Sequence, residues 1–218
     1  MNEFNKNIKG DNERNERLAL GLLIAAGFIG ILFTAPVLAT VAESFLVIEG
    51  ARVTIDDNEF EARLITEGLL IPTDGSEGAF GYGILTEDGD AIVVATTHAG
   101  VLDSEEQSSA EDPTWHTHLV RLGDVAECGE DQGIVDITWQ SPGEVEINDD
   151  IATISDVLTT DEFEGRDSIT GGQLSMTLGE AVSDVISFKL DPVFDEEAGL
   201  LAICVTDVRS AEEEVNLG

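Results

Sequence analysis

The sequence predicts an all-β protein, with an antiparallel β-sandwich or barrel-like domain preceded by one N-terminal transmembrane helix. The domain is predicted from short apolar segments with alternating side chains, such as Ile186, Phe188 and Leu190 with polar residues between them. A two-residue period of this kind is typical of half-buried strands. Turn residues between the segments favour antiparallel hairpins. The helix is predicted from one uncharged apolar run, Leu18–Ala39.

The expected strands are short and are separated by Gly, Asp and Asn residues. Glu87-Asp88-Gly89-Asp90 and Asn148-Asp149-Asp150 each lie between two of them, and Asp-Gly is a favoured hairpin turn. Glu59–Leu70 is also compatible with a short helix, and Ser210–Val215 is expected to form one. The expected strands are Phe45–Ile48, Ala51–Ile55, Phe60–Ile65, Tyr82–Leu85, Ala91–Thr97, Trp115–Leu122, Ile134–Trp139, Glu144–Ile147, Ile151–Ile154, Leu174–Leu178, Val185–Leu190 and Leu200–Val205.

The apolar run Leu18–Ala39 predicts the location of the protein. Its 22 residues span about 33 Å as a helix, and the hydrocarbon core of a bilayer is about 30 Å thick. Basic residues precede the run and are scarce after it. Residues 1–17 are therefore expected to be a cytoplasmic leader, 18–39 the anchor and 43–218 an extracellular domain. The alternative is a secretory signal cleaved after Ala39 or Ala42, which would release a secreted domain.

The charge of the chain lies almost entirely after this run. The net charge is −35, and 41 of the 45 acidic residues follow Ala39, together with only six basic residues. Acid-rich, lysine-poor composition is typical of proteins from extreme halophiles, because high salt shortens the Debye length to about 3 Å at 1 M and limits repulsion. This acidity argues against a nucleic acid partner, since phosphate recognition needs a basic surface.

The sequence contains two cysteines, Cys128 and Cys204. An even number of cysteines in an exported domain predicts a disulfide. Two buried free thiols are the alternative.

The three histidines are candidate metal ligands. His98, His116 and His118 flank an acidic loop, Leu102–Thr114. His116 and His118 are two residues apart, so their side chains share one face of a strand, and His98 ends the preceding expected strand. If the two strands are neighbours, three imidazoles converge in a way that suits zinc or copper.

Other interpretations of these motifs stay open. Val120 and Leu122 continue the face of His116 and His118, so this face is equally compatible with a hydrophobic core that ends in hydrogen-bonded histidines. Acidic pairs in turns offer oxygen ligands for calcium, although none has the spacing of an EF-hand loop. These candidates are Asp56-Asp57, Asp88–Asp90 and Asp149-Asp150.

Two hypotheses of function follow. The chain has no Gly-x-Ser-x-Gly elbow, P-loop or dinucleotide-binding glycine motif, so the first hypothesis is a non-enzymatic surface protein that needs no cofactor. It would be held by the membrane of a halophile-like cell or virus envelope and serve a structural, adhesion or assembly role with other envelope proteins. The alternative is a zinc or copper protein, or a metal-dependent extracytoplasmic enzyme, that uses the three histidines.

The retained anchor gives a testable prediction. If Leu18–Ala39 is an anchor, the native protein should stay with the membrane fraction through high-salt and alkaline washes, because apolar burial is not weakened by salt. Its intact mass should include the leader. A soluble species that begins at Thr40 or Glu43 would instead show that the run is a cleaved signal.

Overall fold

The computed structural model describes residues 43–70, 78–86, 91–168, 170–179, 182–197, 199–211 and 216–217. The run Leu18–Ala39 and the turn Glu87–Asp90 lie outside them. Within the described ranges every regular element is a strand, apart from two short 3-10 turns, η1 (Ser44–Leu46) and η2 (Ala126–Cys128). The predicted all-β class is confirmed. No helix in this part of the chain is long and apolar enough to cross a membrane.

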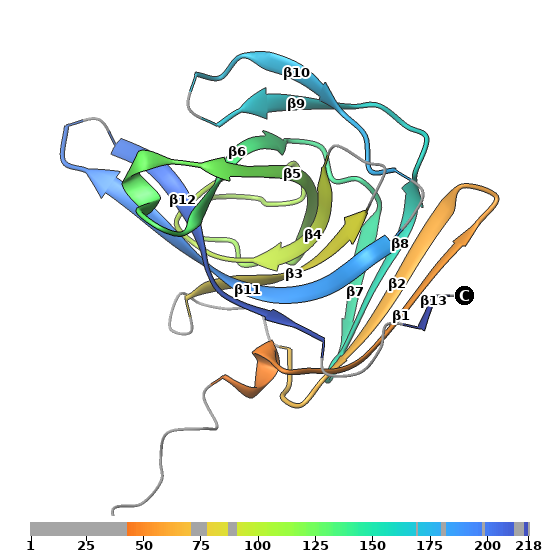
Figure 1. The fold of residues 1–218 in the computed structure, drawn as a ribbon. Coiled ribbons are helices and arrows are strands. Elements are labelled where there is room, and N and C mark those ends of the chain that lie inside the picture. Colours follow the sequence, from red (N-terminus) through yellow and green to blue (C-terminus); the bar gives the residue numbers. More distant parts are fainter. Residues whose placement is uncertain are drawn as a thin grey trace, which may run out of the picture. The chain divides into compact units, whose positions relative to one another are not determined.

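Six antiparallel strands close into a barrel. β5 pairs with β4 along one edge and with β6 along the other, which joins the two ends of the order β6-β12-β11-β3-β4-β5 (Figure 1). Two further strands, β9 (Phe163–Asp167) and β10 (Gln173–Met176), extend the sheet from β6. The barrel strands are β3 (Ala79–Thr86), β4 (Ile92–Thr97), β5 (His116–Asp124), β6 (Gln132–Thr138), β11 (Val182–Asp195) and β12 (Gly199–Ser210).

A second sheet has the order β13-β1-β2-β8-β7. Tight turns connect its hairpins: Asp57 and Asn58 both have positive φ between β1 and β2, and Asp149 does between β7 and β8. Short polar residues tolerate this conformation, and two-residue turns of this hand match the twist of a hairpin. The strands are β1 (Ile48–Asp56), β2 (Glu59–Thr66), β7 (Glu144–Asn148), β8 (Ile151–Leu158) and β13 (Asn216–Leu217).

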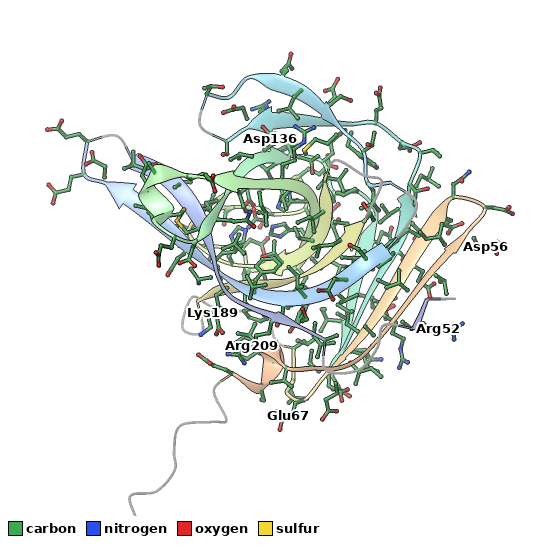
Figure 2. The ribbon with its side chains drawn as sticks, viewed as in Figure 1. Arg52, Asp56, Glu67, Asp136, Lys189 and Arg209 are labelled. Carbon is green, nitrogen blue, oxygen red and sulfur yellow. A yellow bond between two sulfur atoms is a disulfide. The ribbon has the colours of Figure 1, made fainter. Side chains whose placement is uncertain are left out.

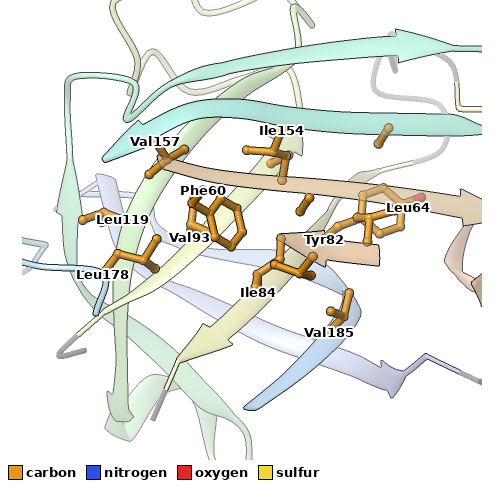
Figure 3. Close-up of a cluster of buried hydrophobic side chains, with 14 of the residues drawn as sticks. Phe60, Leu64, Tyr82, Ile84, Val93, Leu119, Ile154, Val157, Leu178 and Val185 are labelled. Carbon is orange, nitrogen blue, oxygen red and sulfur yellow. The ribbon is translucent and has the colours of Figure 1, made fainter. Parts of the chain in front are cut away.

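The alternation of side chains on the barrel wall separates two hydrophobic cores. Outward residues of β3, β4, β5 and β11 pack against the second sheet, as Figure 3 shows. Inward residues of β4, β5, β6, β11 and β12 form a different cluster inside the barrel. The labelled members of the first core are Phe60, Leu64, Tyr82, Ile84, Val93, Leu119, Ile154, Val157, Leu178 and Val185. The buried members of the second are Val94, Val120, Ile134, Ile186, Phe188 and Val205.

Two expectations about the N-terminal part of the domain are wrong. Phe45–Ile48 does not form a strand, because η1 occupies Ser44–Leu46 and β1 begins only at Ile48. The turn buries the side chain of Leu46 completely, so Leu46 packs in the core although it belongs to no strand. The helix considered for Glu59–Leu70 is replaced by β2, whose buried residues alternate with exposed ones.

Near the C-terminus, Ser210 ends β12 and residues 212–215 of the expected helix lie outside the described residues. β9 has no counterpart among the expected strands, since its sequence, FEGRD, contains a single large apolar residue.

Cys128 and Cys204 form the expected pair, with their Cα atoms 5.4 Å apart and their Sγ atoms bonded. The bond ties η2 to β12 beside the short β12–β6 pairing, in which Cys204 faces Gly133. A Cβ atom on Gly133 would lie 2.5 Å from a methyl group of Val125 and 3.1 Å from Sγ of Cys128. The glycine therefore leaves space for the disulfide and its apolar neighbours.

Two cations of the domain, Lys189 and Arg209, share acidic partners. Arg209 contacts Glu43 at 2.9 Å and Asp207 at 2.7 Å, and Lys189 pairs with the same two carboxylates (Figure 2). Hydrogen bonds from Lys189 and then Arg209 lower the pKa of Glu43, and the bond from Arg209 lowers the pKa of Asp207. Six basic residues cannot pair with 41 acidic ones, so most of the carboxylates repel one another.

This imbalance predicts salt-dependent stability. The melting temperature of the full-length protein should rise substantially between 0.05 and 3 M KCl, because the Debye length falls from more than 10 Å to below about 3 Å. Thermal unfolding in KCl and in potassium sulfate at equal ionic strength checks this, since sulfate also strengthens apolar burial whereas screening depends on ionic strength. A melting temperature that stays constant in KCl would contradict the prediction.

Candidate metal centre

The pairing of β4 with β5 brings the three histidines together. In this register Val94 lies opposite His118 and Thr96 lies opposite His116. His98 follows Thr96 by two residues, so it continues the same inward face just beyond the end of β4. The rings of His98 and His116 have centroids 5.0 Å apart, and those of His116 and His118 are 4.8 Å apart. The predicted convergence of the three imidazoles is therefore present in the structure.

Asp103 completes the cluster from the loop between the two strands. Its carboxylate lies 3.2 Å from Nε2 of His98, 3.4 Å from Nε2 of His116 and 3.7 Å from Nε2 of His118. The ligand atoms of His98, Asp103 and His116 all lie within 4.8 Å of one another. Asp103 is 16% exposed at its side chain, and the side chains of His116 and His118 are at most 1% exposed. Among the described residues this is the one group with metal-ligand geometry.

Backbone carbonyls fix the protonation of two of the rings. Nδ1 of His116 lies 2.7 Å from the carbonyl oxygen of Thr114, and Nδ1 of His118 lies 2.8 Å from that of Thr138. A carbonyl only accepts hydrogen bonds, so each Nδ1 carries a proton, and Nε2 is the ring nitrogen that faces Asp103. Histidines that bind metals are usually oriented by a hydrogen bond of this kind from the nitrogen that does not face the ion.

The polar atoms at the centre of the cluster lack hydrogen bonds. Nε2 of His116, Nε2 of His118 and Oδ1 of Asp103 are buried and have no hydrogen-bond partner within the described residues. A separation of 3.7 Å is too long for a hydrogen bond, whereas buried polar atoms are nearly always paired in proteins. The cluster thus has unpaired polar atoms that face a shared position.

Asp103 is ionised despite its partial burial. Burial is the largest single influence on its pKa and raises it, but interactions with His116, His118 and His98 together outweigh burial and hold the pKa well below its usual range. The carboxylate is therefore available as a negatively charged ligand at neutral pH.

Gln107 holds the loop that presents Asp103. Its amide oxygen accepts hydrogen bonds from the backbone N–H of Asp103 at 3.0 Å and of Ser104 at 3.3 Å. Its amide nitrogen donates to the carbonyl oxygens of Val101 and Asp112. Gln107 is 7% exposed, so these four bonds form an internal brace across the loop.

The sequence predicts three members of the cluster and misses the fourth. Asp103 is one of five acids in Leu102–Thr114, and no spacing rule separates it from the others. The tertiary structure separates them: the side chain of Asp103 turns into the cluster, Glu105, Glu106 and Glu111 are exposed, and Asp112 accepts hydrogen bonds from Ser108 and Thr114 within the loop. The alternative interpretation of this face, a hydrophobic core that ends in hydrogen-bonded histidines, also agrees with the structure. Val120 belongs to the core inside the barrel, and His116 and His118 are hydrogen-bonded to backbone carbonyls.

The acidic pairs proposed for calcium lie in turns. Asp56-Asp57 belongs to the β1–β2 turn and Asp149-Asp150 to the β7–β8 turn. Neither pair joins a group of three or more candidate ligands in the described part of the chain. Asp88–Asp90 lies outside that part.

No family model, curated protein or solved structure matches this chain. Its chemistry is therefore argued from the cluster itself. Three imidazoles and one carboxylate are ligands for first-row transition metals, and such ions polarise bound water or a bound anion.

The brace by Gln107 gives a prediction. Gln107→Leu should lower the free energy of unfolding by about 1–3 kcal/mol, because buried backbone donors lose their acceptor. Hydrogen exchange should become faster at the amides of Asp103 and Ser104 and stay slow in β4 and β5. Gln173→Leu, a matched change at an exposed glutamine, should alter neither property. Unchanged loop exchange in Gln107→Leu would show that the brace does not order the loop.

Proposed function

We propose that this protein binds one divalent transition-metal ion, zinc in the first instance, through His98, His116, His118 and Asp103. The observation that carries the proposal is the pair of buried Nε2 atoms, of His116 and His118, that face the carboxylate of Asp103 without hydrogen bonds. A cation held between the three imidazoles and the carboxylate would satisfy all four groups at once.

The spacing of the ligand atoms supports this proposal. A tetrahedral ion with bonds of about 2.0–2.1 Å holds neighbouring ligand atoms about 3.3 Å apart. Nε2 of His98 and of His116 lie 3.2 and 3.4 Å from the carboxylate of Asp103. His118 is slightly farther, at 3.7 Å, and a small rotation of its ring brings it into range.

The ligand types select the class of metal. Calcium and magnesium prefer oxygen ligands throughout, so a site with three imidazoles disfavours both. Zinc and copper accept nitrogen with one oxygen. The chain has no free cysteine within the described residues, so the thiolate ligand of a blue-copper centre is not supplied.

The location of the site supports a role outside the cytoplasm. A disulfide persists in oxidising compartments, and Cys128 is bonded to Cys204. Together with the apolar run Leu18–Ala39, this supports a domain displayed on the outer side of a membrane. The envelope, adhesion or assembly role expected from the sequence is compatible with such a domain, but the cluster favours metal binding as the activity to test first.

Metal analysis of the full-length protein tests the proposal. Protein purified in molar KCl, stripped with a chelator and reloaded with zinc should retain about one equivalent after gel filtration, measured by mass spectrometry of the metal. His116→Ala and Asp103→Asn should each weaken binding by at least about tenfold, since ligand loss costs more than the 10–100-fold typical of a second-shell change.

The matched control is Glu105→Gln, which removes one charge from an exposed side chain of the same loop and should retain full binding. Copper loading with an electron paramagnetic resonance spectrum distinguishes a nitrogen-coordinated copper site from nonspecific binding to surface carboxylates. Equal zinc retention by the wild type, Asp103→Asn and His116→Ala would overturn the proposal.

A further inference from the structure

The barrel encloses a cavity beside the histidine cluster. The space open to the centre of a water-sized molecule is about 50 Å³, whereas a single water needs about 10–15 Å³ on this measure. All six barrel strands contribute to its wall, and Figure 1 shows them surrounding the interior. Small barrels are normally filled by their inward side chains, so this space is suited to a small ligand.

The wall of the cavity is polar at one end only. His98, Asp103 and His118 line it together with Thr96, whose hydroxyl donates to the carbonyl oxygen of Phe80. The remaining lining side chains are apolar, among them Val120, Ile134, Ile186 and Phe188. A ligand that fits this wall has one polar end and one apolar body, because an unpaired polar group against the aliphatic wall would be costly.

The charge of the metal-loaded cluster would favour a ligand whose polar end is an anion. A divalent ion would bring two positive charges to three neutral imidazoles and one carboxylate, which leaves a net charge of +1 in a largely buried site. An anion that binds the ion from the cavity side neutralises this charge. Zinc expands to five ligands and copper accepts tetragonal geometry, so either ion has a position for it.

Residues that retain solvent exposure contribute to the wall of the cavity. Ala79 lines it next to His98, since Phe80 pairs with Thr97. Ala79 is half-buried, and the lining residue Pro192 is exposed. A ligand can therefore enter past exposed lining residues such as Pro192 and occupy the barrel interior.

We propose that the barrel binds a small monocarboxylate whose carboxylate coordinates the metal and whose compact aliphatic or monocyclic body fills the apolar cavity. This inference rests on the proposed metal site and names the class of ligand that the site takes. The apolar body supplies affinity by burial against the aliphatic wall, and the carboxylate supplies orientation.

Benzoate is the probe for the test, with acetate as the same head group without a body and benzyl alcohol as the same ring without a charge. Binding is followed through the visible absorption of the Co²⁺-loaded full-length protein and by calorimetry of the zinc form, both in molar KCl. Benzoate should bind with a dissociation constant at least about tenfold below that of acetate, which corresponds to burial of part of the ring. Benzyl alcohol should leave the cobalt spectrum unchanged.

Ala79→Leu places a larger side chain in the cavity wall next to His98, at a half-buried position that tolerates it better than the core does. It should retain one equivalent of metal and lose the advantage of benzoate over acetate. Ala51→Leu, at a half-buried alanine of β1 in the other sheet, should retain both properties.

The outcomes separate this inference from the metal proposal. One equivalent of metal with equal affinities for benzoate and acetate, or a benzoate advantage that persists in Ala79→Leu, would overturn the cavity proposal and leave the metal site standing. Loss of metal binding in the wild type would overturn both.

Discussion

The pairing of β4 with β5 inside a closed barrel is the constraint on which the site depends. This register places the inward residues of both strands side by side, so His98, His116 and His118 converge although a loop separates them in sequence. Closure of the barrel through the β5–β6 pairing then buries the cluster, and it supplies the Thr138 carbonyl that orients His118. Without closure the same histidines would be solvated side chains on a sheet edge.

Burial gives these histidines their chemical significance. An exposed imidazole satisfies both nitrogens with water, but Nε2 of His116 and of His118 has no partner within the described residues. Leaving such atoms unpaired in a low-dielectric interior costs about 1–3 kcal/mol each. Several such atoms around the carboxylate of Asp103 are the observation behind the proposed metal site, and the apolar wall of the adjoining cavity would keep water away from a bound ion.

The surface and the interior of this domain follow opposite electrostatic rules. On the surface, a few cations each contact more than one carboxylate, as Arg209 does with Glu43 and Asp207. Salt reduces the repulsion among the remaining carboxylates by screening. Inside, Asp103 forms no ion pair with a Lys or Arg in the described part of the chain, and its neighbours are the imidazoles that face it. High salt weakens surface interactions far more than buried ones, so the contacts of Asp103 depend less on salt than the surface ion pairs do.

The sequence by itself determined the strand content, the disulfide partners and the three histidine candidates. These follow from local rules: a two-residue period in segments such as Ile186–Leu190, the presence of just two cysteines, and the shared face of His116 and His118. Only the tertiary structure decided that the strands close into a barrel and that Asp103, of the five acids in its loop, turns inward. Both depend on contacts between different strands and loops, such as Val120 of β5 with Ile137 of β6 and Asp103 of the loop with His116 of β5, and no local pattern encodes them.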